Sequence, residues 1–209
     1  GRRKTKTVGS SQTGFVYDGL NFVQELTGST VNANLLTGGI DEVFQRKEAT
    51  ATRYPITDAL GSVIALTDAS GTLATEYSFE PYGKATTSGA ADNNSQSFTA
   101  RENDGTGLFY YRARYYMPGC GRFISEDPLG LPGGSNLYAY ANSNPVRWGD
   151  PLGLFASCKA NGGGGVNIDI PISFSGDGNN PNTANALRRA IEDAWSSDGF
   201  TVRVPQGPE

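Results

Sequence analysis

Histidine is absent from the 209 residues of this sequence. Its absence excludes Ser-His-Asp and Cys-His catalytic triads, nuclease sites that depend on histidine, and zinc sites with histidine ligands within these residues. Any chemistry that the chain carries must therefore use carboxylates, Lys, Tyr, Ser, Thr, Cys or backbone groups.

Cysteine and net charge are scarce as well. The two cysteines, Cys120 and Cys158, lie in separate segments and lack the spacing of a metal site, so we expect no metal and favour no disulfide. The formal net charge of −4 gives no general attraction to nucleic acid or to an anionic membrane. The basic residues 2–6 form one short cluster, which is typical of a solvated chain end.

Long apolar runs are also missing. No stretch approaches the ~20 apolar residues that a membrane-spanning helix needs, and the basic start is not followed by the apolar segment of a signal peptide. Met117 is the only methionine, so we expect a fragment or a processed piece whose targeting signal need not be visible.

Glycine, proline and aromatic residues are abundant instead. The 28 glycines, 11 prolines and 11% aromatic content predict many short strands joined by tight turns rather than helical bundles. Because only 37% of the residues are hydrophobic, the predicted core is modest. The composition therefore predicts a mainly β fold.

Hairpin-like segments follow one another between residues 15 and 87. The apolar run 63–66 ends at the turn-forming residues 68–71, and Tyr77 and Phe79 share one face of a further strand. Tyr, Asp and Gly recur at similar places in these segments. This recurrence indicates a degenerate repeat whose units must stack on their neighbours to bury a face.

From residue 98 onward the sequence is dense in motifs. The motifs are FTAREND (98–104), TGLFYYRARYY (106–116), GRFISEDP (121–128), NLYAY (136–140) and DPLGL (150–154). In this order and spacing they resemble the Rhs repeat-associated core, and the upstream Tyr-Asp pattern is similar to YD repeats. The resemblance covers about three quarters of the chain, and its long series of motifs is more specific than any short pattern.

This resemblance implies an organisation for the chain. YD-type β-hairpin repeats would occupy 1–97, the Rhs repeat-associated core 98–154, and a variable C-terminal tail 155–209, as a truncated toxin or the start of the cargo. The fold would be mainly β, with antiparallel β-hairpin repeats forming part of a shell-like curved sheet and with a small α+β tail.

Local patterns add detail outside the core. Residues 84–97 are small and polar, which predicts a loop. In the tail, residues 155–165 predict a Gly-rich linker, residues 166–174 a strand and residues 183–197 a helix. No dense cluster of catalytic residue types identifies an activity or a target for the tail.

Two aspartates lie in identical pentapeptides, because Asp127 and Asp150 each begin the sequence DPLGL. One interpretation is a type I turn, in which proline presets φ and the aspartate oxygen accepts a hydrogen bond from a turn amide. The other is a pair of catalytic carboxyl groups, of which one activates water while the other donates a proton. With no histidine present, this pair is the strongest candidate for a hydrolytic site.

The resemblance favours the catalytic interpretation. In Rhs proteins and the similar C components of Tc toxins, such aspartates are implicated in self-cleavage at the end of the core. Asp127 and Asp150 would then be catalytic, in a single-turnover aspartyl self-cleaving protease, and the cut would fall between Leu154 and Phe155. Arg122 could support a carboxylate, although an arginine at such a position is more often an ordinary surface residue. The core motifs can also persist where cleavage has been lost.

The run 110–116 alternates aromatic residues with Arg112 and Arg114. Such interleaving occurs in sites that stack nucleic-acid bases. In an acidic chain we favour cross-strand aromatic packing with arginine stacked on tyrosine, and we expect no nucleic-acid partner for the core.

The predicted function is that of a C-terminal segment of an Rhs polymorphic-toxin shell, which encapsulates a C-terminal toxin and releases it by aspartyl autoproteolysis after Leu154. The resemblance implies the upstream Rhs shell and the toxin as partners, together with an immunity protein and a secretion-system carrier. It also implies a bacterial effector that is secreted or delivered to the cell surface. We expect no cofactor. The alternatives are a non-catalytic YD-repeat surface, adhesion or interaction module, and an inactive fragment that folds poorly.

Overall fold

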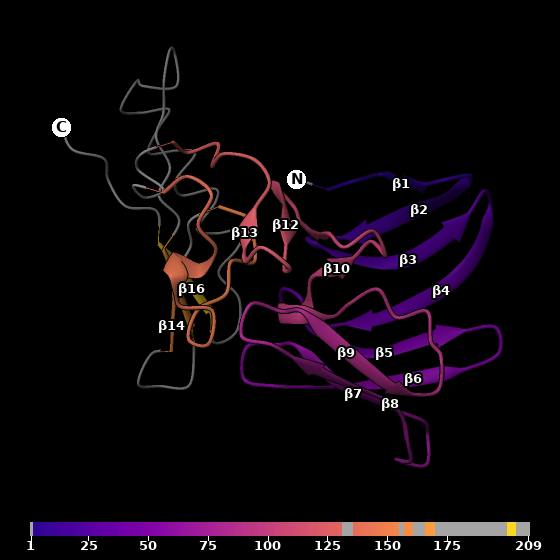
Figure 1. Cartoon of the computed structure of the whole chain (residues 1–209). Helices are drawn as coiled ribbons and strands as arrows, with labels where there is room; N and C mark the ends of the chain where they lie inside the picture. Colours follow the sequence, from indigo (N-terminus) through magenta and orange to yellow (C-terminus); the bar gives the residue numbers. More distant parts are fainter. Residues whose placement is uncertain (1, 131–135, 155–156, 161–165, 170–199, 204–209) are drawn as a thin grey trace.

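The structure of the chain is a computed structural model in which antiparallel β-strands make up almost all regular structure (Figure 1). The mainly β fold built of hairpins, predicted from composition and turn spacing, is confirmed. The structure describes residues 2–130 and 136–154, and the backbone of three strands at 157–160, 166–169 and 200–203.

One large sheet contains nine strands, each paired antiparallel with the next along the chain (Figure 1). Spatial order equals sequence order because every connection is a hairpin. The strands are β1 (Thr5–Val8), β2 (Ser11–Asp18), β3 (Asn21–Thr27), β4 (Thr30–Thr37), β5 (Val43–Glu48), β6 (Thr52–Thr57), β7 (Val63–Thr67), β8 (Leu73–Phe79) and β9 (Ala85–Gly89).

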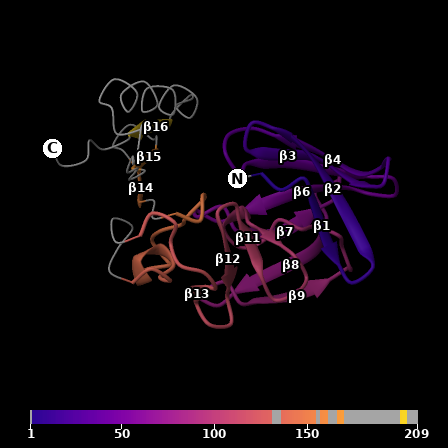
Figure 2. The ribbon, with the colours of Figure 1, turned by 90° about the horizontal axis from the view of Figure 1, so that it is seen from above.

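The large sheet is curved rather than flat (Figure 2). Its shortest ladder is the one between β5 and β6, which contains two residue pairs, Arg46 with Arg53 and Lys47 with Thr52. Register shifts interrupt several other ladders, including β2 with β3 and β6 with β7. Such irregularities increase the local bend and twist of a sheet, which accounts for the curvature.

The turns before and after β7 are built alike. Oδ1 of Asp58 accepts hydrogen bonds from the amides two and four residues later, at 2.9 and 2.8 Å. Oδ1 of Asp68 does the same at 2.8 and 3.0 Å. In each turn the third residue after the aspartate is a glycine with a φ of +82°, a conformation that L side chains rarely adopt. The turn predicted at 68–71 is therefore confirmed.

The loop predicted at 84–97 is wrong in its first part, because strand β9 lies there. β9 pairs with β8 from Thr75 and Gly89 to Phe79 and Ala85. All residues of β9 are exposed. An edge strand without a buried face has no alternation of apolar residues, so the sequence pattern gives no sign of it.

A small sheet with an aromatic core lies beside the large one (Figure 1). Tyr111, Tyr116 and Phe123 are fully buried there. The rings of Tyr111 and Tyr116, from adjacent strands, lie 5.4 Å apart, so the expected cross-strand aromatic packing is present. The strands are β10 (Glu102–Asn103), β11 (Phe109–Tyr111), β12 (Arg114–Met117) and β13 (Arg122–Phe123), and the 3-10 helices are η1 (Phe98–Ala100) and η3 (Ala141–Ser143).

The basic start of the chain is not a solvated end at Arg3, contrary to expectation. The Arg3 side chain is 8% exposed and forms ion pairs at 2.6 Å with both Glu102 and Asp104. Its guanidinium also lies over the rings of Phe15 and Tyr110, at 4.9 and 4.3 Å. These partners come from both sheets and lie far along the chain, so a local pattern of charge could not predict them.

The tail contributes β14 (Ser157–Ala160), β15 (Val166–Asp169) and β16 (Phe200–Arg203), in which β15 pairs antiparallel with β14 and parallel with β16. The first four residues of the strand predicted at 166–174 are therefore a strand. The rest of that prediction and the helix predicted at 183–197 lie outside the described residues. The Gly-rich linker predicted at 155–165 is wrong at 157–160, because β14 lies there and pairs with β15.

Candidate functional site

Both candidate aspartates form the turns that their local sequence predicts. The carbonyl oxygen of each accepts a hydrogen bond from the glycine three residues later, at 2.9 Å for Asp127 and 3.2 Å for Asp150. Oδ1 of Asp127 accepts from the amide of Leu129 at 2.9 Å, and Oδ1 of Asp150 accepts from the amide of Leu154 at 3.0 Å. One oxygen of each carboxyl group is therefore used within its own turn.

The other oxygens of the two carboxyl groups meet at a single arginine. Nη2 of Arg114 lies 2.9 Å from Oδ2 of Asp127 and 3.3 Å from Oδ2 of Asp150. The three side chains are almost fully buried, at 2 to 4% exposure. Two turns that are far apart in sequence are thus joined by one buried cation, and their carboxyl groups lie close together.

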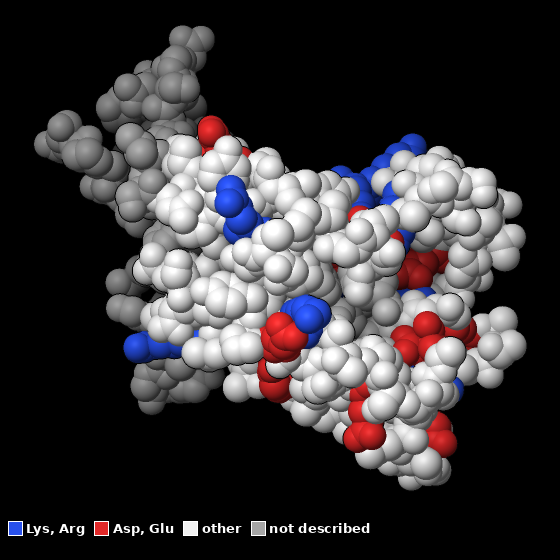
Figure 3. Space-filling model, in the orientation of Figure 1, with Lys and Arg blue, Asp and Glu red and all other residues white. Residues whose placement is uncertain are grey.

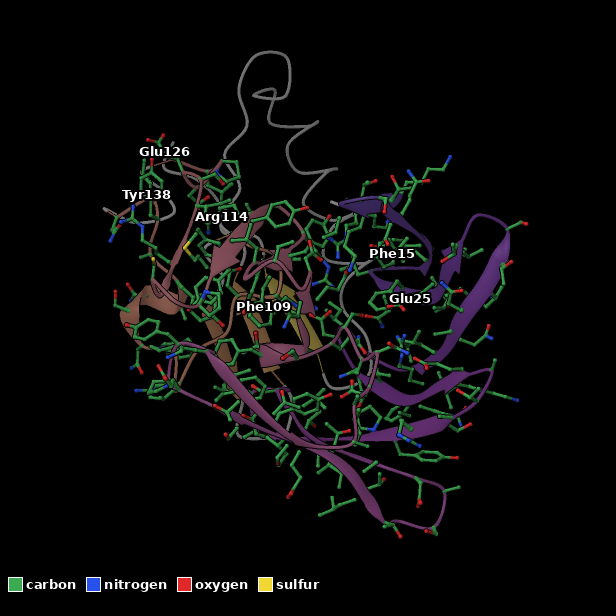
Figure 4. All side chains as sticks on the ribbon, turned by 45° about the vertical axis from the view of Figure 1, so that its right-hand side comes forward. Phe15, Glu25, Phe109, Arg114, Glu126 and Tyr138 are labelled. Carbon is green, nitrogen blue, oxygen red and sulfur yellow. The ribbon has the colours of Figure 1, made fainter. Side chains whose placement is uncertain are left out.

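Arg114 is held by its strand and by the backbone around it. As the first residue of β12 it lies on the same face as the buried Tyr116. Nε donates to the carbonyl of Gly153 at 2.5 Å and Nη1 donates to that of Leu137 at 3.0 Å, while the guanidinium lies 3.7 Å from the ring centroid of Phe123. Figure 4 shows Arg114 on the small sheet.

The segment that contains Leu154 is packed directly on the β11–β12 hairpin. The amide of Ala113 donates to the carbonyl of Leu152 at 3.1 Å. Gly153 has a φ of +65°, and a Cβ at this position would lie 2.1 Å from the carbonyl oxygen of Tyr111. The backbone of the DPLGL segment therefore approaches the hairpin as closely as only glycine permits.

Burial raises the pKa of Asp150. Arg114 and the amides of Leu152 and Leu154 lower it, the nearby Asp127 raises it, and the resulting pKa is about 7. Burial also lowers the pKa of Arg114, which the two carboxylates oppose. Near neutral pH, Asp150 can therefore exist in either protonation state, as a proton donor or acceptor must.

Arg122, the residue expected to support a carboxylate, has other contacts. It is exposed, and its guanidinium lies 5.0 Å from the ring centroid of Tyr138. Because side chains alternate along a strand, the burial of Phe123 directs Arg122 to the opposite, outer face. Figure 4 shows Tyr138 beside Glu126, away from Arg114.

Arg114 is the functional candidate that the sequence analysis missed as a partner of the aspartates. The signal was present, since strand alternation places it on the face of Tyr116, inside the aromatic core. A buried arginine needs acidic or carbonyl partners, and two unassigned aspartates were available. Of the predicted cleavage site, Leu154 is half-buried and Phe155 lies outside the described residues.

Within the described residues, no cluster of His, Cys, Asp and Glu side chains could hold a metal ion. In the same residues, no helix is long and apolar enough to cross a membrane. Figure 3 shows acidic and basic side chains interspersed on the face that it draws, without a continuous basic surface among the described residues there.

Curated proteins with similar sequences carry the names of toxins. The chain is 34% identical over 169 residues to double-stranded DNA deaminase toxin A of Burkholderia cenocepacia, which covers 68% of this chain and 12% of that protein. It is 33% identical over 174 residues to the tRNA nuclease WapA of Bacillus subtilis, which covers 78% of this chain and 8% of the relative. It is 36% identical over 107 residues to toxin subunit YenC1 of Yersinia entomophaga, which covers 49% and 11%. The chain is similar to a part of bacterial toxin proteins.

Solved structures give the same result. The Tc holotoxin pore of Photorhabdus luminescens matches with a TM-score of 0.58 and 26% identity over 77% of this chain and 9% of that chain. The TcdB2-TccC3 crystal structure matches with a TM-score of 0.56 and 26% identity over 72% and 8%. No family model matches the chain. The chain spans about a tenth of the length of these relatives.

Proposed function

We propose that this chain is the C-terminal part of an Rhs-type toxin shell, and that Asp127 and Asp150 cut it after Leu154 to release the polypeptide that follows. The observation that carries the proposal is the meeting of both carboxyl groups at Arg114, beside the segment that ends at Leu154. In this proposal the YD-type repeats occupy 1–97, the core 98–154 and the released tail begins at 155.

The names of the relatives support a carrier function for the shared stretch. One relative is named for DNA deamination and another for tRNA cleavage, yet their matches cover 68% and 78% of this chain and therefore overlap. Because the named activities differ while this stretch is common, the stretch serves something other than either activity. A crystal structure of TcdB2-TccC3 without its hypervariable C-terminal region also matches, so the similarity is retained when that region is absent.

The geometry supports hydrolysis by two carboxyl groups in different roles. Asp127 would act as the base that removes a proton from water, and Asp150 would donate a proton to the departing amine. The new C–O bond forms on the carbonyl carbon of Leu154 as its C–N bond to Phe155 breaks. The 3.0 Å hydrogen bond between the Leu154 amide and Asp150 folds the chain back, so the catalyst and its substrate are held together before reaction.

The proposed partners follow from the shell. The upstream Rhs repeats would close the wall around the toxin, an immunity protein would neutralise the toxin in the producing cell, and a secretion-system carrier would deliver the effector. Among the described residues β1 is an edge strand of the large sheet, and an edge strand can pair with a further strand, which fits the upstream part of the proposal.

A non-catalytic YD-repeat surface module is the second candidate function. The observation in its favour is that one oxygen of each aspartate caps its own turn and the other is bound to Arg114. Such a cluster could serve only to tie the end of the core to the small sheet.

The intact mass of the chain, expressed with the upstream shell, separates the two functions. We expect two polypeptides from the parent and a single polypeptide from Asp127→Asn and from Asp150→Asn. Asp68→Asn is the matched control, because Asp68 caps a similar turn in an exposed hairpin, and it should be cut like the parent. A folded parent that stays whole would leave the structural module as the function.

A further inference from the structure

A second group of charged residues holds the DPLGL segment from the other side. The carbonyl oxygen of Pro151 accepts hydrogen bonds from Nη1 of Arg112 and, at 3.3 Å, from Nη1 of Arg101. Both arginines form ion pairs with Asp41. We call Asp41, Arg101 and Arg112 the clamp. Its members come from the β4–β5 loop, the end of η1 and the β11–β12 turn, and they meet one residue after Asp150.

The clamp is buried and dense in positive charge. The Arg101 and Arg112 side chains are 3% and 5% exposed. Burial lowers the pKa of Arg101 to about 9, with Arg112 as a further cause, and burial lowers the pKa of Arg112 to about 10. Two buried guanidinium groups close together are unfavourable unless their surroundings compensate them, and here Asp41 is the carboxylate that pairs with both.

Two of the three clamp residues have a strained backbone. Asp41 has a φ of +66° and Arg112 a φ of +54°, both in the left-handed region that non-glycine residues rarely occupy. Such conformations persist where the surrounding contacts require them, and they often occur near functional sites. In both residues the strained backbone supports a side chain that belongs to the clamp.

The position of Asp41 is set by the large sheet. Its amide donates to Oδ1 of Asn21 at 2.8 Å, and Nδ2 of Asn21 donates to the carbonyl of Gly39 at 2.7 Å. Arg112 is tied to the same region, because its Nη2 donates to the carbonyl of Leu20 at 3.2 Å. The clamp therefore holds the Pro151 carbonyl at a position that depends on the folded β2–β3 and β4–β5 turns.

We propose that Asp41 is a positioning residue for self-cleavage: through Arg101 and Arg112 it fixes the Pro151 carbonyl, and so makes the placement of Asp150 and Leu154 depend on the folded large sheet. The proposal rests on the self-cleavage proposed above. Its consequence is an order of events, in which the wall strands β2–β5 must be in place before the chain can be cut.

Hydrogen exchange tests the clamp independently of cleavage. In the uncut Asp127→Asn chain, the amides of Ala113 and Leu154 report whether the segment is held, because they donate to Leu152 and Asp150. Adding Asp41→Asn should speed exchange at both amides by about tenfold or more, while amides in β3 and β4 stay protected. Unchanged exchange at both amides, or equal loss of protection throughout β2–β5, would overturn the proposal.

Cleavage rates provide the second arm. Asp41→Asn alone should slow release by on the order of tenfold or more, because a small displacement of reacting groups has effects of this size. The double variant Asp41→Asn with Arg101→Gln removes one charge of each sign, so it leaves no additional uncompensated charge in the clamp that could unfold the chain. Its cleavage should still be slow. Asp41→Glu should recover part of the rate, and Asp68→Asn should have no effect.

The two arms separate the two proposals. If the parent is not cut but Asp41→Asn loosens Ala113 and Leu154, self-cleavage fails and the clamp stands as a structural element. If the parent is cut, and Asp41→Asn and the double variant are cut at the same rate as the parent, the positioning role is wrong while self-cleavage remains.

Discussion

The turns that begin at Asp127 and Asp150 have the same sequence but different surroundings. Both are closed by a glycine in the left-handed region, with a φ of +67° at Gly130 and +65° at Gly153. No atom of the described residues lies within 4 Å of the place that a Cβ of residue 130 would take, whereas Gly153 is packed on the carbonyl of Tyr111. The Asp150 turn also contributes two carbonyl oxygens to arginines, at Pro151 and Gly153.

This difference teaches that the local sequence determines the turn and the tertiary structure determines its chemistry. Proline, glycine and the aspartate oxygen are sufficient to form either turn. Burial raises the pKa of Asp150 to about 7, and the Asp150 carboxyl group accepts a hydrogen bond from the amide of Leu154 at 3.0 Å. Substitutions at the contacts that join the two turns, or that distinguish one turn from the other, should therefore have unequal effects.

Replacing Arg114, the residue that joins the two turns, should have the largest effect on stability and cleavage. Arg114→Gln leaves two buried carboxyl groups without their cation, so we expect a loss of about 3–5 kcal/mol in the free energy of unfolding and loss of cleavage. Arg122→Gln is the matched control, because Arg122 is exposed, and it should change stability by less than about 0.5 kcal/mol. Denaturant titration measures the stability of both variants, and equal losses would contradict the assignment of Arg114 as the residue that joins the two turns.

Alanine substitution at Gly130 and at Gly153 should destabilise the two turns to different extents. Gly130→Ala meets no neighbouring atom, so it should cost only the left-handed backbone penalty of about 1–2 kcal/mol. Gly153→Ala adds a collision with the Tyr111 carbonyl, so we expect about 3 kcal/mol or more and slower release of the tail. Thermal unfolding and the release rate measure the pair, and similar losses at both positions would show that the close packing of Gly153 is incorrect.

The protonation of Asp150 should appear in the pH dependence of release. If Asp150 donates the proton, its protonated fraction falls as pH rises through about 7, so the rate should fall about twofold from pH 6 to 7 and about tenfold from pH 6 to 8. A rate that rises steadily from pH 6 to 8 would assign the donor role elsewhere.

The same raised pKa has a consequence for stability. The folded chain keeps the Asp150 proton between the ordinary value of 3.8 and about 7, so this group's contribution is fully present below that window and is lost as pH rises through it. Asp150→Asn should remove this part of the pH dependence of stability. Denaturant titrations at several pH values would measure it, by comparing the uncut Asp127→Asn chain with the same chain that also carries Asp150→Asn.

The sequence predicts the elements of this molecule better than their long-range contacts. The aspartate-capped turns around β7, the aromatic packing of residues 110–116 and the two DPLGL turns follow from residue types and period. Three features do not follow: the edge strand β9, which lacks a buried face, the buried Arg3, and the clamp at Asp41. Each depends on partners that lie far along the chain or on the absence of a pattern.

The candidate site shows the same limit. The absence of histidine and the repeated pentapeptide were enough to select Asp127 and Asp150 as candidates, whereas the preference for a catalytic pair over two turns came from the resemblance to Rhs proteins. On sequence grounds Arg122 could support a carboxylate or be an ordinary surface residue. The burial of Phe123 directs Arg122 outward, and Arg114 is the arginine that lies over Phe123 and contacts the two aspartates.

Cleavage in water enriched in oxygen-18 tests the central claim most directly. If Asp127 and Asp150 activate water at the bond after Leu154, mass spectrometry should find a tail that begins at Phe155 and no heavy oxygen in it. The new carboxyl group at Leu154 should carry one heavy oxygen. A cut elsewhere, such as at the Asp-Pro bonds of either pentapeptide, or a Leu154 carboxyl group without heavy oxygen, would contradict the account.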